Sequence, residues 1–474
     1  MKAILTLLAA LLVSLNSHAA PLPAAVKASL KQAGIPLSAV GIEVREVASA
    51  RSPLFSLNAR QPMNPASTMK LLTTFAGLEL LGPAYTWKTE AWLDGKLENG
   101  TLQGDLVLKG YGDPKFTVEQ FWLWLSELRA RGLREIRGDL VLDRSFFELP
   151  PHDPGAFDND PVRAYNVGPD ALLLNFNTLR LRYLPVGNHM KIISEPQLDG
   201  VTLDNRLLPD PSKNGCDNWD DTILVQPKGD SVVLQGGYPG ECGEREHNLN
   251  VMPHTRYVEA VFRALWQQLG GTLHGKLRDG TAGDSAQLFS THHSEPLSSV
   301  IRDINKFSNN VMARQLFLTL GTATSASSNE PGEKAPGSIA RSTEAVRAWL
   351  SGRKLDFPEL ILENGAGLSR TERISAQHLA QLLQKAADSP LSAELVASLP
   401  ILGVDGSVKK RLRGSASAGH AHLKTGTLEG VKAVAGYVRS RSGKEWIVVF
   451  LINHQNARRS QDAQDALIEW VQKR

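Results

Sequence analysis

Ser67 and Lys70 have the residue types and the spacing that nucleophilic chemistry requires. They lie in NPASTMKLLTTFAGLELLG, residues 64–82, where a polar start followed by apolar residues predicts an amphipathic helix. Because residues three apart share one face of a helix, the Lys70 amine could take the proton of the Ser67 hydroxyl. A lysine has an ordinary pKa of about 10.4, so it acts as a base only where burial or a second cation lowers that pKa. Ser67 could also cap the helix, where backbone N–H groups could stabilise an oxyanion.

The S-x-x-K spacing is weak evidence by itself, because the chain contains it three times. The other pairs, Ser351/Lys354 and Ser407/Lys410, lie in WLSGRKLDF and DGSVKKRLRG, which read as solvated surface. Only Ser67 opens a long helix with an apolar face.

A second motif, Ser308-x-Asn310, lies between the predicted helices EPLSSVIRDINKF and NVMARQLFLTLG. A break of this kind can direct short polar side chains into a cleft, although Ser308 alone would be read as a helix cap. The same S-x-N spacing recurs at Ser56, Ser212 and Ser327, so its context singles out Ser308.

A third motif, Lys424-Thr425-Gly426, occurs once, on a predicted strand just before a C-terminal hairpin. Lys424 and Thr425 could bind a carboxylate, and Gly426 would let the backbone of a ligand approach closely. The alternative is an ordinary edge strand.

The three motifs in this order are typical of penicillin-binding proteins and class A β-lactamases, which are acyl-transfer enzymes with an active-site serine. Beyond the motifs, nearly the whole chain resembles the class C low-molecular-mass penicillin-binding proteins of the penicillin-binding protein 4 type. These are D-alanyl-D-alanine carboxypeptidases and endopeptidases of the bacterial cell wall. The resemblance rests on four segments, GDLVLKGYGDPKFT (104–117), ENGAGLSR (363–370), LPILGVDGSVKKRL (399–412) and HLKTGTLEGVKAVAGYV (422–438).

The resemblance implies a catalytic role for five residues. Ser67 would be the acylated nucleophile, and Lys70 its general base. Ser308 would relay a proton to the leaving D-alanine, Asn310 would bind the substrate backbone, and Lys424 would supply positive charge beside the serines.

It also implies five substrate-binding residues. Thr425 would bind the terminal carboxylate, and the N–H of Thr427 would complete an oxyanion hole with the N–H of the nucleophilic serine. Asp160, Tyr165 and Arg370 match positions that line the family's side-chain pocket, where Asp160 would meet the free amino end of a diaminopimelate-type residue.

Two positions depart from the pattern or are ambiguous. Glu429 occupies a position where a close family member would have Gln, which puts the preferred stem peptide in doubt. Asp160 lies in HDPGAFDND, an acidic run that could equally be a solvated loop.

The resemblance predicts an α/β (α+β) fold: a serine β-lactamase/transpeptidase-like domain built from both chain ends, with two β-rich inserted domains. Periodicity agrees, because short strands fill the middle of the chain, while helices are predicted at 296–306, 309–320, 340–352, 374–388 and 392–399, with an exposed loop at 321–339. The approximate boundaries are 1–19 for a signal peptide, 20–84 and 291–474 for the catalytic domain, 85–165 and 245–290 for inserted domain II, and 166–244 for inserted domain III.

The N-terminus, MKAILTLLAALLVSLNSHAA, predicts a secretory signal peptide cut after Ala19, and hence a periplasmic protein. Its apolar run is too short to span a bilayer comfortably, and no stable membrane anchor follows. A net charge of +3 over 474 residues gives no nucleic-acid footprint. The two cysteines, Cys216 and Cys242, are predicted to form a disulfide rather than stay as two thiols.

The expected partners are peptidoglycan stem peptides, their cross-links and β-lactam antibiotics. No metal or organic cofactor is implied, and family members can be dimers, so a homodimer is an open alternative. One rival function is a β-lactamase, since Glu246 to Asn250 (EHNLN) matches the deacylation motif of such enzymes, but it precedes Ser308 instead of following it. The other rival is a non-catalytic peptidoglycan-binding protein, against which the complete set of motifs argues.

Overall fold

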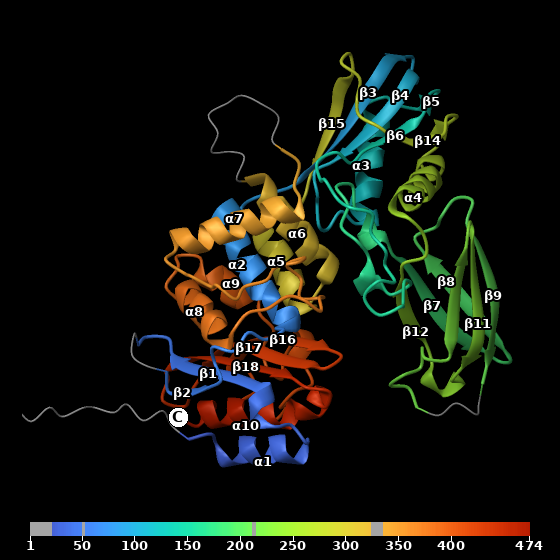
Figure 1. Ribbon diagram of the computed structural model, residues 1–474. Coiled ribbons are helices and arrows are strands. Elements are labelled where there is room, and N and C mark those ends of the chain that lie inside the picture. Colours follow the sequence, from blue (N-terminus) through green and yellow to red (C-terminus); the bar gives the residue numbers. More distant parts are fainter. Residues whose placement is uncertain (1–20, 50–52, 211–214, 324–334) are drawn as a thin grey trace, which may run out of the picture.

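Two bodies make up the protein, one from the ends of the chain and one from its middle, as Figure 1 shows. The computed structural model describes residues 21–49, 53–210, 215–323 and 335–474. The predicted signal peptide lies outside these residues, as do positions 324–334 of the predicted loop and the S-x-N serines Ser212 and Ser327.

A five-stranded antiparallel sheet unites the two chain ends, as the fold class predicts. Its order is β16–β17–β18–β1–β2, with strands at β1 Val40–Glu46, β2 Phe55–Leu57, β16 Ala421–Leu428, β17 Val431–Arg439 and β18 Glu445–Asn453. Alternate residues of a strand point to opposite faces, so Ala433 and Ala435 join one core, and Val434 and Val438 join the other. Both faces of the sheet are therefore buried.

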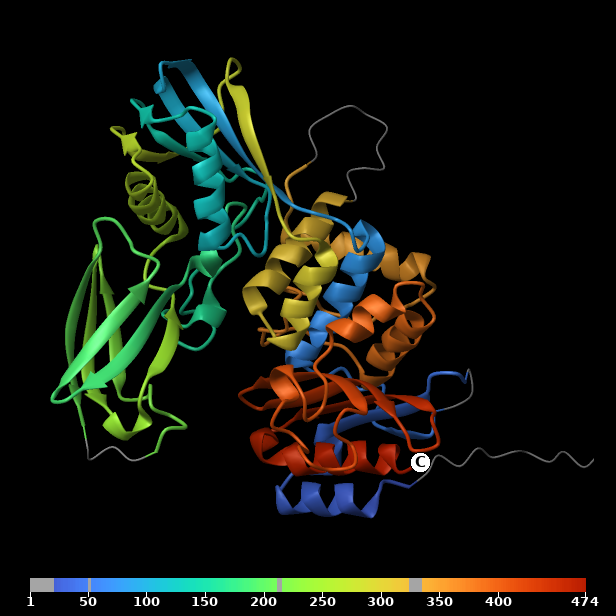
Figure 2. The same ribbon diagram turned by 180° about the vertical axis from the view of Figure 1, so that it is seen from behind.

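Helices cover each face of this sheet (Figures 1 and 2). One face packs on the two terminal helices, α1 Ala24–Gln32 and α10 Gln461–Gln472. The other face supports a group of helices, namely α2 Lys70–Leu81, α5 Leu297–Lys306, α6 Asn310–Ala323, α7 Ile339–Gly352, α8 Ala376–Ala387 and α9 Ser392–Ser398. The five helices predicted after residue 296 are all present.

The segment around Ser67 differs from the amphipathic helix predicted for it. A single 3₁₀ turn, Ala66–Met69, comes first, and α2 begins only at Lys70. Every residue from Lys70 to Leu78 is buried, because α2 lies in the middle of the helical group. A helix that is covered on all sides needs no polar face.

A seven-stranded sheet forms the upper part of the inserted body in Figure 1. Its strands are β3 Lys88–Glu98, β4 Thr101–Gly110, β5 Glu135–Ile136, β6 Leu140–Asp143, β13 Thr272–Leu273, β14 Leu277–Asp279 and β15 Gln287–His293. Asn99 and Gly100 turn between β3 and β4 with positive φ, as the Asn-Gly pair predicts. Two helices pack with this sheet: α3 Val118–Ala130, which periodicity predicts, and α4 His254–Gln268, which it does not.

Two three-stranded sheets form a sandwich in the lower part of the inserted body. One sheet has the order β10–β11–β9 and the other β12–β7–β8, with strands at β7 Leu179–Val186, β8 His189–Glu195, β9 Thr202–Pro209, β10 Ile223–Lys228, β11 Ser231–Tyr238 and β12 Arg245–Leu249. Tyr183 of one sheet stacks on Tyr238 of the other, with ring centroids 6.0 Å apart. Cys216 and Cys242 form a disulfide beside this core, with Cα atoms 5.4 Å apart.

Two of the predicted domain boundaries cut through sheets. β12 pairs with β7, so the sandwich continues past the boundary between residues 244 and 245. β15 pairs with β3 along Gln287–His293, so the seven-stranded sheet continues past the boundary between 290 and 291. Periodicity identifies a strand, but the partner that decides its domain is distant in sequence.

Candidate active site

Ser67 lies on the 3₁₀ turn that precedes α2. Hydrogen bonds to residues that are distant in the sequence hold this turn in place. The Asn64 side chain accepts from the N–H of Ala66 at 2.9 Å and donates to the carbonyl of Ser369 at 2.8 Å. Asn453 at the end of β18 exchanges two hydrogen bonds with the Asn64 backbone. These contacts fix Ala66 at a φ of 45° and leave Ser67 partly exposed.

Lys70 is the first residue of α2, and its side chain is completely buried. Its Nζ lies 3.1 Å from Ser67 Oγ, 2.6 Å from Asn310 Oδ1 and 2.5 Å from the carbonyl oxygen of Ala366. No carboxylate lies within ion-pair distance of this amine among the described residues. The first two predicted motifs therefore meet at Lys70.

Ser308 connects the second motif to the third. It lies between α5 and α6 with a φ of 58°, in the left-handed region, and its Oγ accepts from Lys424 Nζ at 2.8 Å. The N-terminal cap of α6 is provided by Asn309, whose Oδ1 accepts from the N–H of Met312. Ser308 is therefore not a helix cap, and its hydroxyl faces the lysine of β16.

Lys70 and Lys424 both have a pKa below that of an ordinary lysine. Burial lowers the pKa of Lys70 well below its usual value, and the charges of Lys424 and Arg314 lower it further, while Glu372 acts in the opposite direction. Burial alone lowers the pKa of Lys424 to about 7. A neutral lysine is a competent base, so the site meets the condition that the sequence left open.

The missing side chain of Gly426 makes room for a different neighbour from the one predicted. A Cβ at this position would lie 2.9 Å from the carbonyl oxygen of Pro65 and 2.9 Å from the N of Ser67. The close neighbour of Gly426 is therefore the turn that carries the serine, not a ligand. Gly367 approaches the same turn, since a Cβ there would lie 1.9 Å from the carbonyl oxygen of Ala66. Both glycines are required for the packing around Ser67.

Glu372 organises the turn whose carbonyl contacts Lys70, a role that sequence analysis missed. Its buried Oε1 accepts the backbone N–H groups of Glu363, Asn364 and Gly365, at 3.1, 3.0 and 3.0 Å. The next residue, Ala366, supplies the carbonyl that accepts from Lys70. Burial raises the pKa of Glu372, although the N–H donors oppose the rise.

Ser407 and Lys410, the third S-x-x-K pair, are exposed, as predicted. Sequence analysis did not predict the contact of Ser407 with the third motif, where its Oγ lies 2.9 Å from Thr425 Oγ1. Thr427, two residues along β16, accepts from Lys432 Nζ at 3.2 Å. The exposed edge of β16 thus presents a row of hydroxyl groups supported by neighbouring side chains. The remaining pair, Ser351 and Lys354, is exposed, as predicted.

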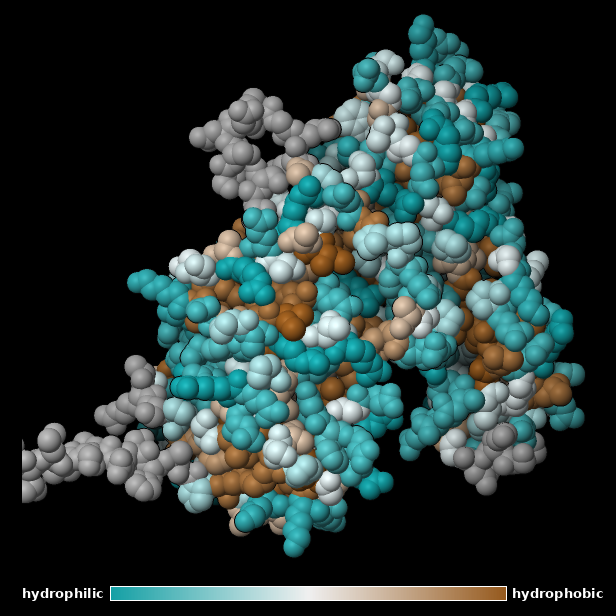
Figure 3. Space-filling view, viewed as in Figure 1, coloured by the Kyte–Doolittle hydropathy of each residue, from teal (hydrophilic) through white to brown (hydrophobic). Residues whose placement is uncertain are grey.

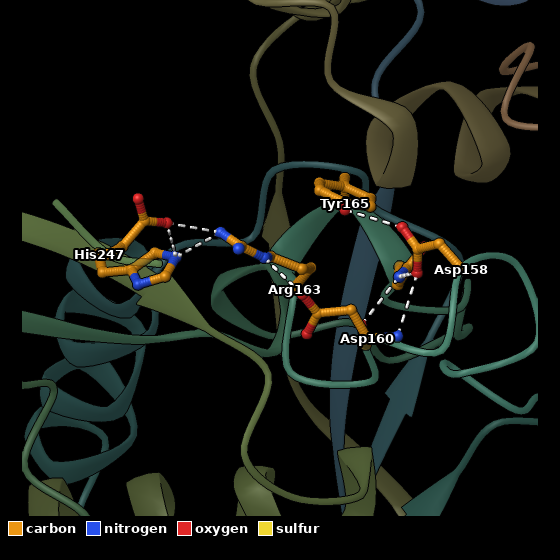
Figure 4. Close-up of polar contacts among 7 residues, drawn as sticks. Asp158, Asp160, Arg163, Tyr165 and His247 are labelled. Atoms are coloured by element: carbon orange, nitrogen blue, oxygen red, sulfur yellow. Dashed lines mark hydrogen bonds and ion pairs between the residues drawn. The ribbon is translucent and has the colours of Figure 1, made fainter. Parts of the chain in front are cut away.

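Asp160 and Tyr165 belong to a polar network that Figure 4 shows. Asp160 Oδ2 accepts from Arg163 Nε at 2.7 Å, and Arg163 also binds Asp220 Oδ2 at 2.7 Å. The Tyr165 hydroxyl donates to Asp158 Oδ2 at 2.8 Å, and burial is the main cause that raises its pKa to about 12. The carboxylate predicted to meet a substrate amine is therefore already paired with an arginine.

Arg370 contacts the loop that carries Asp160 and the turn that follows β16. Its guanidinium covers the ring of Phe157, 4.5 Å from the ring centroid, and lies 3.6 Å from the Glu429 carboxylate. Glu429 is 85% exposed. The residue that departs from the family pattern is therefore an exposed acid beside Arg370.

Two cavities flank these residues. One, of about 490 Å³, is lined by Ser308, Asn310 and Tyr165. The other, of about 1230 Å³, is lined by Arg370 and by Phe157 and Pro161 of the loop that carries Asp160. The three predicted pocket residues are therefore divided, because Tyr165 and Arg370 line different cavities and Asp160 is not part of either lining.

The EHNLN segment lies on β12, in the sandwich. Its Glu246 side chain is exposed there, in a different sheet from the serine turn. The pattern is therefore a coincidence of spacing, as its order along the chain suggests.

The described part of the chain contains no group of three or more His, Cys, Asp or Glu side chains that could hold a metal ion. In the same residues, no helix has the length and the apolar character needed to cross a membrane.

Comparison with known proteins agrees with this architecture. The chain is 28% identical over 423 residues to a D-alanyl-D-alanine carboxypeptidase of Actinomadura sp. strain R39, covering 85% of this chain and 76% of the relative. It is 27% identical over 397 residues to the D-alanyl-D-alanine carboxypeptidase DacB of Haemophilus influenzae, covering 82% and 80%. The crystal structure of penicillin binding protein 4 (dacB) from Haemophilus influenzae superposes with a TM-score of 0.77 at 24% identity, covering 94% of this chain and 99% of that one. Residues 22–474 match the D-Ala-D-Ala carboxypeptidase 3 (S13) family, and this protein is therefore a member of that family of enzymes.

Proposed function

We propose that this protein is a serine D,D-peptidase of peptidoglycan that uses Ser67 as its nucleophile. It removes the terminal D-alanine from stem peptides and cleaves the D-alanine cross-links between them. The observation that carries this proposal is the placement of Lys70, a buried amine 3.1 Å from Ser67 Oγ, with no carboxylate of the described residues within ion-pair distance. The relatives named as D-alanyl-D-alanine carboxypeptidases, and the endopeptidase Bd3459 of Bdellovibrio bacteriovorus among proteins of similar fold, support the reaction class.

The mechanism has an acylation step and a hydrolysis step. Neutral Lys70 takes the proton of Ser67 as Oγ bonds to the carbonyl carbon between the two D-residues. The C–N bond then breaks, and the leaving amine receives a proton through Ser308, which Lys424 holds at 2.8 Å. Water hydrolyses the resulting ester and releases Ser67.

Two other groups act on the substrate in this proposal. Gly426 lies against the N of Ser67, which brings the following N–H of Thr427 beside it as an oxyanion hole. Each such donor is worth about 2.7–4 kcal/mol in the transition state. Thr425 binds the terminal carboxylate with Ser407 as its neighbour. Asp160, Tyr165 and Arg370 recognise the substrate side chain, and Asp160 must share its charge between Arg163 and the substrate amine.

We further propose that the protein binds penicillin at Ser67 and acts in the periplasm after removal of its leader. The Haemophilus influenzae relative has been crystallised in complex with a β-lactam, which supports the first point.

The test is digestion of purified muropeptides by the wild-type protein. We expect loss of one alanine from pentapeptide monomers and conversion of cross-linked dimers to monomers, both followed by chromatography and mass spectrometry. A β-lactam should inhibit both reactions and itself turn over slowly. Rapid, repeated hydrolysis of penicillin without cleavage of muropeptides would instead identify a β-lactamase.

Glu372 provides a second prediction, because it acts through the turn that holds Lys70. Replacing Glu372 by alanine removes the acceptor of three backbone N–H groups. The hydrogen bond from Gly365 is buried and the other two are part-buried, and an unsatisfied buried donor costs about 1–3 kcal/mol. We expect kcat/KM to fall about 100-fold, since a small misplacement of a catalytic group has that effect. Glu372→Gln keeps an oxygen acceptor and should retain more activity. Equal kcat/KM for the folded fraction of all three proteins would contradict this role.

A further inference from the structure

A groove leads from the second motif across the inserted body. The cavity beside Ser308 and Asn310 is about 490 Å³ in volume, and a neighbouring cavity of about 380 Å³ adjoins it. The two share five lining residues, which are Val118, Glu119, Arg180, Glu195 and Pro196. Figure 3 shows the surface hollowed between the body that carries the five-stranded sheet and the sandwich. The joined cavities extend from Ser308 and Asn310 to Arg182 and Gln197 in the inserted body.

The far wall of this groove is the outer face of the sheet β12–β7–β8. Arg180 of β7 lies between Asn248 of β12 and Glu195 of β8 in the strand register, so the three side chains form a row across the sheet. Arg182, two residues further along β7, is on the same face, because Leu181 and Tyr183 point into the sandwich core. This outer face of the sheet therefore carries polar side chains. The alternate residues along the same strand are apolar and lie in the sandwich core.

The charges on this face are mixed. Arg180 and Arg182 both contact Glu195 Oε2, at 3.2 and 3.4 Å, so two guanidinium groups share one carboxylate oxygen. Glu246 lies opposite Arg182 on β12, and Glu119 lines the groove from the start of α3. Each of the two arginines keeps about two fifths of its side chain exposed, at 41% and 37%. Such a wall suits a ligand that carries carboxylates and a free ammonium group together.

Exposed aromatic groups stand where the groove leaves the catalytic residues. Phe307, directly before Ser308, is 73% exposed, and Tyr165 is 41% exposed. Both line the same cavity as the second motif. Aromatic side chains that remain in water beside a cleft offer contact area to a ligand.

We infer that this groove binds the second peptide stem of a cross-linked peptidoglycan fragment, with Arg180 and Arg182 contacting its carboxylates. The inference rests on the proposed function and extends it. A cross-linked substrate has two stems joined at the scissile bond, so one stem must leave the site across the neighbouring surface. A peptide stem carries carboxylates and the ammonium group of its diamino acid, whereas a glycan strand presents mainly hydroxyl groups. The mixed charges of the wall therefore favour the peptide.

The test compares two substrates in the full-length mature protein, a cross-linked muropeptide dimer and a monomeric pentapeptide. For Arg180→Ala and the double variant R180A/R182A, we expect kcat/KM for the dimer to fall about tenfold or more through KM, with kcat little changed. Values for the monomer, and the rate of penicillin acylation, should stay within about twofold of the wild type. The matched control is Arg206→Ala, which removes an exposed arginine from β9 in the other sheet of the sandwich, where it pairs with Asp204.

Three results would overturn the inference. The first is an unchanged dimer KM in the double variant, and the second is an equal loss for the monomer or in Arg206→Ala. The third is a loss seen only with dimers that carry their disaccharides and not with bare peptide dimers, which would identify the glycan as the occupant. If the wild type cleaved neither substrate, the proposed function would fail, and this result is distinct from the other three.

Discussion

Ser67→Ala should lose peptide cleavage and penicillin labelling together, by a factor on the order of 10⁴ to 10⁶ in kcat. In the proposed mechanism the Ser67 oxygen forms the bond to the substrate carbonyl, whereas the hydroxyl of Ser308, the serine of the second motif, is held by Lys424. The fold should be unaffected. Ser67 is partly exposed, and Lys70 keeps its contacts with Asn310 and Ala366 when the hydroxyl is removed. The measurements are product release from pentapeptide and intact mass after exposure to penicillin.

The chain offers a matched control for this variant. Ser351 also precedes a lysine by three residues, Lys354, but both side chains are exposed at the end of α7. Ser351→Ala should therefore cleave and label like the wild type. A penicillin adduct that survives in Ser67→Ala, or that disappears in Ser351→Ala, would show that the nucleophile is elsewhere.

The fold could be predicted from sequence where local pattern and global packing agree. The apolar segments at 431–439 and 445–452, joined through SRSGKE, predict a hairpin, and they pair in the structure as β17 and β18. The all-round burial of α2 could not be read from its own residues, since it depends on which helices surround it. The same limit explains why β12 was assigned to the wrong side of a predicted boundary and why another boundary runs through β15.

The candidate site divides in a similar way. Three residues of separation place Lys70 beside Ser67, so one helical turn is sufficient to predict the contact. Its contact with Asn310 spans 240 positions, and that between Lys424 and Ser308 spans 116. No periodicity connects such distant residues, and only the ordered set of motifs indicated that they meet.

Residues that act through the backbone left no signal. Ala366 contributes a carbonyl oxygen, which every residue possesses, and Glu372 contributes by binding three backbone N–H groups. The basic residues after Ser407 indicated a solvated surface, and Ser407 is exposed, but they gave no sign of its contact with Thr425. The turn at residues 363–370, which contains Ala366, was indicated only by the resemblance to the family, because that resemblance includes this segment.

The second large effect is expected in the pH dependence of acylation. The direction of this dependence follows from the protonation state of Lys70. In the proposed mechanism Lys70 is the base and must be neutral to act, so kcat/KM should fall as the pH drops below its pKa. Burial is the largest cause that lowers this pKa, and the charge of Lys424 is the next. Lys424→Met removes that charge, so Lys70 should hold its proton to higher pH. The acid limb of the profile should therefore move upward by about one to two pH units, the size expected for a like charge nearby at intermediate dielectric.

Glu372→Gln should move the same limb in the opposite direction. The Glu372 carboxylate raises the pKa of Lys70, so its removal should let Lys70 lose its proton at lower pH. Because the pKa of Lys424 is itself about 7, its charge is present mainly below that pH, and the difference between Lys424→Met and wild type should be largest there. The measurement is the second-order rate of penicillin acylation from about pH 5 to about pH 10, which avoids later steps. If both variants shifted the limb in one direction, or neither shifted it, Lys70 would not be the base, because opposite charges around a single titrating amine must act with opposite signs.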